Sequence, residues 1–164
     1  MSDNYTPLYS EVLDKLGKIK TKKDKVTHLK QYNDASLRMV IKSSFDPKIK
    51  WSLPEGEVPY TKNEAPAGTE HTRLATESKK LWHYIKGADG QTPQWKKEQM
   101  FVQMLEGLHQ SEAELLVNAK DKKLHQVYKG LSTNVVREAF GWTEEFVLPD
   151  TDNYPQAAGS ASGL

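Results

Sequence analysis

The chain has 164 residues, and its 23 Lys and Arg nearly balance its 22 Asp and Glu. This length suits one ordinary domain with a single core. The absence of cysteine excludes a disulfide scaffold, a zinc–cysteine site and a thiol nucleophile. No apolar run is longer than three residues, and the first ten residues contain neither a basic start nor an apolar stretch. We therefore expect a soluble protein without a membrane segment or a secretion signal.

The charge is distributed unevenly along the chain. Residues 11–50 carry 11 Lys and Arg against 5 Asp and Glu, and residues 79–137 carry 10 against 6. The connection over residues 51–78 and the end of the chain over residues 138–164 are acidic. Such asymmetry bears on partners and not on fold, although solvated helix faces produce it as well.

Helix-starting residues precede three apolar patterns in the first 45 residues. The first pattern follows Thr6 and Pro7, the second follows Thr21, and the third follows Asn33 or Asp34. Apolar residues recur at helical spacing behind these starts, namely Leu8, Val12, Leu16 and Ile19, then Val26 and Leu29, then Leu37, Val40, Ile41 and Phe45. The sequence therefore predicts three short helices in a compact bundle.

Prolines and glycines interrupt this rhythm over residues 46–72 and exclude a long helix there. The segment is nevertheless too apolar for a free linker, because it contains Trp51, Leu53, Val58 and Tyr60. We expect a long ordered Pro-rich loop that is held to the bundle by its aromatic residues.

The second half of the chain has helical patterns again. A first helix is expected with an apolar face of Leu74, Ser78, Leu81, Trp82 and Ile85. A second starts at Thr92 and Pro93 and carries Trp95, Phe101, Met104, Leu105 and Leu108. A capping box at Ser111 and Glu114 starts a third, and Ser132 caps the last. Residues 149–164 have almost nothing to pack. The fold prediction is an all-α, compact multi-helix domain over residues 1–148 with a disordered acidic tail over residues 149–164.

The sequence lacks the patterns that carry catalysis. There is no P-loop, no dinucleotide-binding glycine motif and no nucleophile elbow. The five histidines are never three or four residues apart, so no helix offers a two-histidine metal face. We expect no enzyme activity, no cofactor and no metal site.

Two stretches resemble the N-terminal DNA-binding domain of the ATP-dependent DNA ligases of tailed phages. The first runs from Leu8 to Phe45 and contains a basic turn, IKTKKDK, over residues 19–25, followed by LKQYNDASLRMV over residues 29–40. The second is YKGLSTNVVREAF over residues 128–140. The resemblance implies a glycine turn that brings a helix start to the duplex backbone, and no ligation, because the catalytic domains are absent.

Most of residues 5–142 also resemble an uncharacterised family of small proteins from cyanobacterial myoviruses. The segments that carry this resemblance are WSLPEG at 51–56, Pro59 and Tyr60, GTEH at 68–71, LWHYIKG at 81–87 and FVQMLEGLH at 101–109. The resemblance implies a phage protein in the cytoplasm of a host cell, with no activity attached.

The physical case for DNA binding rests on two basic helix starts, where backbone N–H groups and the helix dipole favour a phosphate. The candidate residues are Lys20, Thr21, Lys22, Lys23 and Lys25 at the first start, and Lys129, Ser132, Thr133, Asn134 and Arg137 at the second. Such contacts would be independent of sequence and would suit an accessory factor in replication, recombination or repair. Equally, Thr21 and Ser132 could act only as helix caps, with the lysines keeping the surface solvated.

The main alternative is a protein-interaction module that docks on a phage replication or recombination protein or on a host protein. The candidate docking segment is the apolar run Phe146, Val147 and Leu148, which has acidic residues on both sides. The same run could also fold back on the core. A virion component is a third possibility. The aromatic residues Trp51, Tyr60, Trp82, Trp95 and Trp142 could stack on bases, but we expect most of them in the core.

Overall fold

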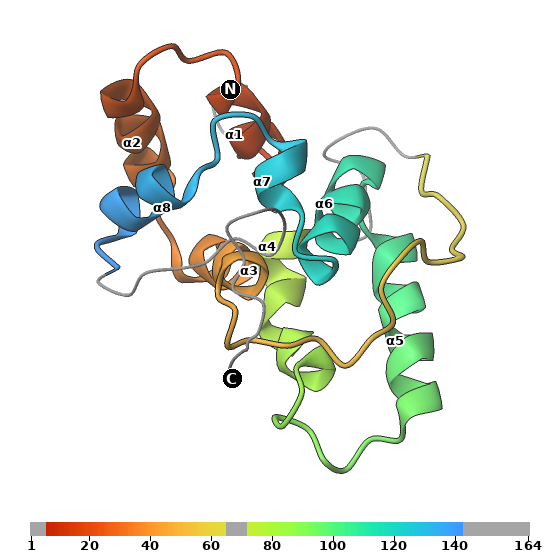
Figure 1. The fold of residues 1–164 in the computed structure, drawn as a ribbon. Coiled ribbons are helices and arrows are strands. Elements are labelled where there is room, and N and C mark those ends of the chain that lie inside the picture. The colour runs from red at the N-terminus through yellow and green to blue at the C-terminus, as the bar shows by residue number, and fades with distance from the viewer. Residues whose placement is uncertain (1–5, 65–71, 143–164) are drawn as a thin grey trace.

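A computed structural model describes residues 6–64 and 72–142 of the chain (Figure 1). Within these residues the fold is helical, as predicted, and the one pairing of extended backbone is an isolated antiparallel bridge between Trp51 and Ile85. The helices are α1 (Tyr9–Leu16), α2 (Lys22–Gln31), α3 (Ala35–Phe45), α4 (Leu74–Glu77), the 3₁₀ helix η2 (Ser78–Tyr84), α5 (Gln94–Gly107), α6 (Gln110–Lys120), α7 (Leu124–Val127) and α8 (Thr133–Phe140). The boundary expected at residue 148 and the acidic tail lie outside the described residues.

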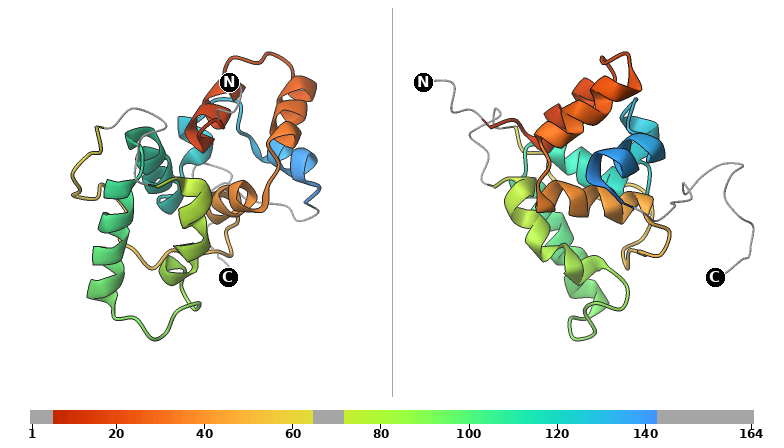
Figure 2. Two further views of the ribbon diagram at one scale, coloured as in Figure 1. Left: turned by 180° about the vertical axis from the view of Figure 1, so that it is seen from behind. Right: turned by 90° about the vertical axis from the view of Figure 1, so that its left-hand side faces the viewer.

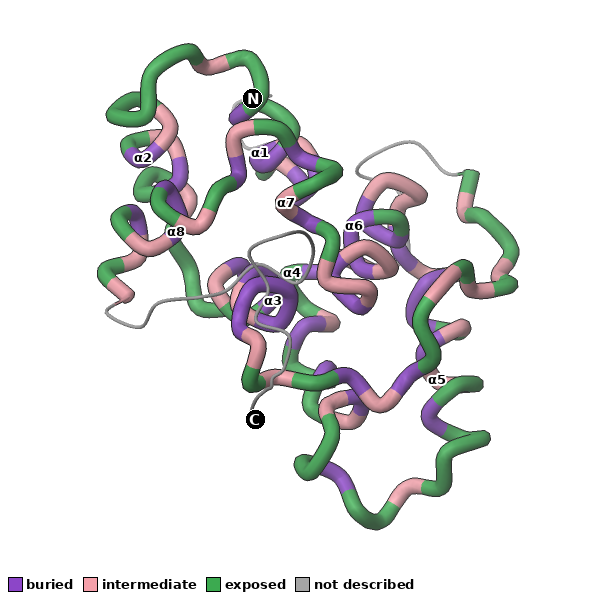
Figure 3. The backbone as a smooth tube through the Cα atoms, viewed as in Figure 1, coloured by how far each residue is buried: buried purple, intermediate pink, exposed green. Residues whose placement is uncertain are grey.

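The helices pack around one core in which α3 and α6 are central. Figure 3 shows α3 and α6 largely buried, whereas the turns that precede α2 and α5 are largely exposed. Helices from the two halves of the chain meet at one end of the molecule, where α2 packs side by side with α8 (Figures 1 and 2). The turn between η2 and α5 lies at the opposite end. The molecule therefore has two separate ends, one built by α2 and α8 and the other by the η2–α5 turn.

The predicted helix starts in the first half are confirmed in two of three cases. Thr21 Oγ1 accepts a hydrogen bond from the backbone N–H of Asp24, and Asp34 Oδ1 accepts one from Leu37. The first helix, by contrast, does not begin at Thr6. Its N-cap is Leu8, whose backbone N–H donates to the carboxylate of Glu11 at 2.8 Å, so an acid in the first turn replaces the expected hydroxyl cap.

Residues 46–64 cross the bundle in extended form, and backbone and buried side chains fasten them. Trp51 is 7% exposed and its indole N–H donates to the Ser43 carbonyl at 3.1 Å. On the other side, the Lys120 ammonium donates to the carbonyl oxygens of Pro54 and Gly56 at 2.6 and 3.1 Å. A buried lysine is tolerated here because its hydrogen bonds are made.

Three predictions for the second half are wrong. Thr92 is not the cap of α5, which begins at Gln94 with Pro93 as its N-cap and without a side-chain cap. Residues 74–84 form a short α-helix followed by a 3₁₀ helix and not one α-helix, because Ser78, Leu81 and Tyr84 are buried at a spacing of three. Ser111 is not an N-cap: α6 begins at Gln110, and the ring Nδ1 of His109 accepts the N–H of Ser111 at 3.1 Å.

A buried carboxylate joins the starts of three helices. Glu112, in the first turn of α6, is 1% exposed. Its Oε2 accepts the N–H of Tyr9, the first residue of α1, at 2.9 Å, and its Oε1 accepts the N–H of Leu74, the first residue of α4, at 2.8 Å. One side chain thus ties segments from the beginning, middle and second half of the chain together.

Candidate nucleic-acid interface

The two turns that precede α2 and α8 lie against each other. Gly130 has a φ of +90°, and a Cβ placed on it would lie 2.7 Å from the carbonyl oxygen of Leu16. A Cβ placed on Gly17 would lie 3.4 Å from the Cβ and from the carbonyl oxygen of Lys129. Glycine at position 130 therefore permits an approach of the two turns that a side chain would obstruct. This approach brings the two predicted groups of cations to one end of the molecule.

Both predicted caps are present at these helix starts. Thr21 caps α2, as described above, and Ser132 Oγ accepts the N–H of Val135 at 3.3 Å. A cap of this kind satisfies one of the N–H groups that a helix start leaves free, so the positive end of the dipole remains. Asp24, exposed in the first turn of α2, opposes that potential.

The cations around the two turns are mostly unpaired. Lys20, Lys23 and Lys129 are exposed, Lys25 is half-buried, and none of the four has an ion pair among the residues that the structure describes. Lys22 differs, because its ammonium lies 3.0 Å from the carboxylate of Glu138 on α8 and both side chains are more than half exposed. An exposed pair of this kind contributes little stability and can exchange partners.

Arg137 borders a polar hollow of about 250 Å³ between α2 and α8, which Lys22, Asn134, Glu138 and Trp142 also line. Arg137 Nε and Thr133 Oγ1 are buried, and neither atom has a hydrogen-bond partner within residues 6–64 and 72–142. A buried donor without a partner is costly in a folded protein. Arg137 therefore lines a hollow that it shares with a second cation, Lys22, while its Nε is buried without a partner in the described chain.

The structure thus gathers both predicted groups of residues at the α2–α8 end. Sequence reasoning missed Glu138, which pairs with Lys22, and Gly17, which faces Lys129. Glu138 directly follows Arg137, so its charge was visible in the sequence, but its partner on α2 became visible only in the fold. The proposed docking segment of Phe146, Val147 and Leu148 lies outside the described residues.

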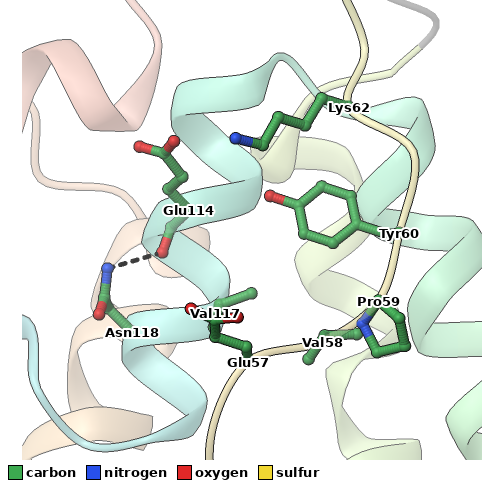
Figure 4. A pocket seen from close by; sticks show the side chains of 8 residues that line it. All are labelled: Glu57, Val58, Pro59, Tyr60, Lys62, Glu114, Val117 and Asn118. Carbon is green, nitrogen blue, oxygen red and sulfur yellow. Dashed lines mark hydrogen bonds between the residues drawn. The ribbon is translucent and has the colours of Figure 1, made fainter.

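A second hollow, of about 440 Å³, lies between residues 57–62 and α6 (Figure 4). The Tyr60 phenol and the Lys62 ammonium point into it from the loop, and Glu114 faces them from α6. Burial raises the pKa of Tyr60. The hollow has mixed charge and no histidine in its lining, so we assign no reaction to it.

Neither metal binding nor membrane insertion finds support in the described part of the chain. No group of three His, Cys, Asp or Glu side chains there is placed to hold a metal ion. None of the helices described has both the length and the apolar character that a membrane crossing requires.

Comparison with known protein families gives a match over most of the chain. The profile described as "Family of unknown function (DUF6433)" matches residues 12–126. No curated protein and no solved structure matches the chain.

Proposed function

The chain belongs to the family of unknown function DUF6433, and we propose that it binds duplex DNA through backbone phosphates without reading the base sequence. The proposal includes no catalytic step. Together with the phage setting that the resemblances imply, this activity suits an accessory factor for replication, recombination or repair in the cytoplasm of a host cell.

The observation that supports this proposal is the meeting of the two basic turns. Lys20 and Lys129 belong to segments far apart in sequence, yet the turns that carry them pack through Gly17 and Gly130. Unpaired cations gathered from separate segments form the electrostatic footprint expected of a phosphate-binding surface. The hollow beside Arg137 adds a guanidinium, which suits the bidentate geometry of a phosphate.

The acids at this end of the molecule limit the expected affinity. Asp24 and Glu138 both lie beside the proposed contact, and Glu138 must release Lys22 if that lysine is to bind a phosphate. We therefore expect binding that is weak at physiological salt and strengthens markedly as salt is lowered.

The proposal is tested by titrating labelled duplexes of two unrelated sequences with the protein at several salt concentrations. The double variant Lys20→Ala/Lys129→Ala should weaken binding to both duplexes alike, and it should lower the slope of log affinity against log salt by about 1.8 if both contacts are lost. The matched control is Lys62→Ala/Lys123→Ala, which removes two exposed lysines from outside the α2–α8 end and should leave the slope unchanged.

Circular dichroism melting of every variant verifies that the fold is intact. A wild-type protein without duplex affinity at low salt would refute the proposal, as would equal losses in the two double variants.

A further inference from the structure

Two tryptophans are exposed where η2 meets α5, against the expectation that they lie in the core. Trp82 is 49% exposed and Trp95 is 65% exposed. Both flank the turn over residues 85–93, which forms the end of the molecule opposite to α2 and α8 (Figures 1 and 2). Indole rings carry a large apolar area, so their exposure at one end of a small protein suggests a contact that covers them.

The turn between the tryptophans is rigidly built around Asp89. The ring Nδ1 of His83 lies 2.7 Å from Asp89 Oδ2, and Asp89 Oδ1 accepts the backbone N–H groups of Gln91 and Thr92 at 2.9 and 3.1 Å. The buried Lys97 ammonium donates to the Asp89 carbonyl at 2.7 Å. Asp89 therefore links the end of η2 to the start of α5.

Trp82 is oriented by the same group of contacts. Its ring stacks on that of His83, with centroids 3.8 Å apart and planes inclined by 30°. Because the His83 ring is hydrogen-bonded to Asp89, it gives the indole a fixed surface on which to pack. A platform that is already ordered loses little conformational entropy when a ligand stacks on it.

Two exposed lysines lie where the extended segment at Trp51 pairs with the end of η2. Lys50 and Lys86 lie opposite each other beside the Trp51–Ile85 bridge, and the Lys86 N–H donates to the Lys50 carbonyl at 2.7 Å. Like charges placed opposite each other in this way are unfavourable unless an anion lies between them. In the described chain neither lysine has an ion pair.

Two further lysines adjoin the tryptophans directly. Lys79 precedes Trp82 by three residues, which places both on one side of a 3₁₀ helix, and Lys96 follows Trp95 in the first turn of α5. The neighbouring Gln94 amide donates to the Ser52 carbonyl at 2.9 Å, so the start of α5 is fastened to the extended segment that carries Lys50. Lys50, Lys79, Trp82, Lys86, Trp95 and Lys96 together form what we call the tryptophan–lysine end.

We infer that the tryptophan–lysine end binds single-stranded nucleic acid. Unpaired bases stack on Trp82 and Trp95, and the phosphates between them contact the lysines of this end. Duplex DNA does not fit in the same way, because its bases are already stacked on one another. This surface is distinct from the α2–α8 end and goes beyond the proposed duplex contact.

An anionic membrane would also match the charge, but the shape of the surface favours a nucleic acid. A membrane-binding helix needs an extended apolar face, whereas η2 has seven residues and buries its apolar stripe in the core. Trp82 and Trp95 belong to two different helices, one before and one after a polar turn, as separate stacking platforms would.

The test is a titration with oligothymidylate, followed by tryptophan fluorescence and by anisotropy of a labelled strand. Wild-type protein should bind with quenching, since exposed indoles are quenched by stacked bases. Trp82→Ala and Trp95→Ala should each weaken binding about tenfold, and Trp82→Phe and Trp95→Phe should restore most of the affinity because a ring remains. Lys86→Ala should lower the salt slope by about 0.7 per lost contact.

Testing each set of variants against the other ligand distinguishes this inference from the proposed duplex binding. Lys20→Ala/Lys129→Ala should leave binding to oligothymidylate unchanged, and Trp82→Ala/Trp95→Ala should leave binding to duplexes unchanged. The inference is overturned if the wild type does not bind oligothymidylate, or if the alanine variants bind it as tightly as the wild type. Binding of vesicles rich in phosphatidylserine that the tryptophan variants lose, without any binding of oligothymidylate, would identify a membrane surface instead.

Discussion

The packing of the two basic turns can be tested by adding a single methyl group. Gly130→Ala places a Cβ at a φ of +90° and 2.7 Å from the Leu16 carbonyl oxygen, whereas Gly87→Ala places one at a φ of +89° with no atom within 4 Å. The backbone strain is therefore the same in both variants, about 1–2 kcal/mol. The gain from a less flexible unfolded chain is also shared, and it cancels in the comparison. The difference between the variants isolates the collision of the two turns.

The collision should cost about 1–3 kcal/mol beyond the shared strain, because the obstructing atom belongs to the backbone and cannot rotate away. For a chain of this size that corresponds to a melting temperature roughly 3–9 °C lower for Gly130→Ala than for Gly87→Ala. Urea unfolding followed at 222 nm gives the free-energy difference directly. Equal stabilities of the two variants would show that the turns are not in contact, and the observation that supports duplex binding would be lost.

Three further predictions concern stability. Glu112→Ala should lower the free energy of unfolding by about 2–5 kcal/mol, because two buried N–H groups lose their acceptor. Glu114 is exposed, so Glu114→Ala should lower it far less. Similar losses for the two variants in urea unfolding would contradict this prediction. Burial lowers the pKa of Lys122 to about 8, so above that pH the unfolded state binds more protons than the folded state. The free energy of unfolding should therefore rise from about pH 8 towards pH 10. Lys122→Met should flatten this rise, and an unchanged profile would exclude Lys122 as its cause. Ending the chain after Leu148 should leave the melting temperature nearly unchanged, and a drop of several degrees would mean that the tail packs on the core.

The features that the sequence predicted well are local ones. Thr21, Asp34 and Ser132 each accept a hydrogen bond from a residue three positions later, so the signal for the cap and its acceptor lie in the same few residues. The first helix departed from this rule because a carboxylate can bond the N-cap N–H from within the helix, as Glu11 does for Leu8. Where two local solutions exist, the sequence alone does not choose between them.

The two exposed tryptophans depart from the prediction for different reasons, and for Trp82 the reason is the helical period. An α-helix over residues 74–85 would put Leu81, Trp82 and Ile85 on one face, but a 3₁₀ helix buries Ser78, Leu81 and Tyr84 and turns Trp82 outward. In α5 the buried position one helical turn before Phe101 is occupied by Lys97, whose ammonium donates to the Asp89 carbonyl. Trp95 lies on another side of the helix and is exposed. A lysine on an apolar face was the signal that the sequence contained.

The meeting of the two basic turns had no local signal at all. Gly17 and Gly130 are ordinary turn residues when each is considered alone, and their contact depends on how α2 packs against α8. The candidate residues could thus be named from the sequence, but their common location could not.

The bonds made by Glu112 have a consequence for the way in which the chain opens. The first turn of a helix near a chain end normally frays, and its amide hydrogens exchange with water without any wider unfolding. The N–H of Tyr9 is instead held by a side chain 103 residues away, and the N–H of Leu74 by the same side chain 38 residues away. Neither amide can be released unless the start of α6 moves, so both should exchange as slowly as the centre of the core. The beginning of α1 then behaves as part of the last structure to open.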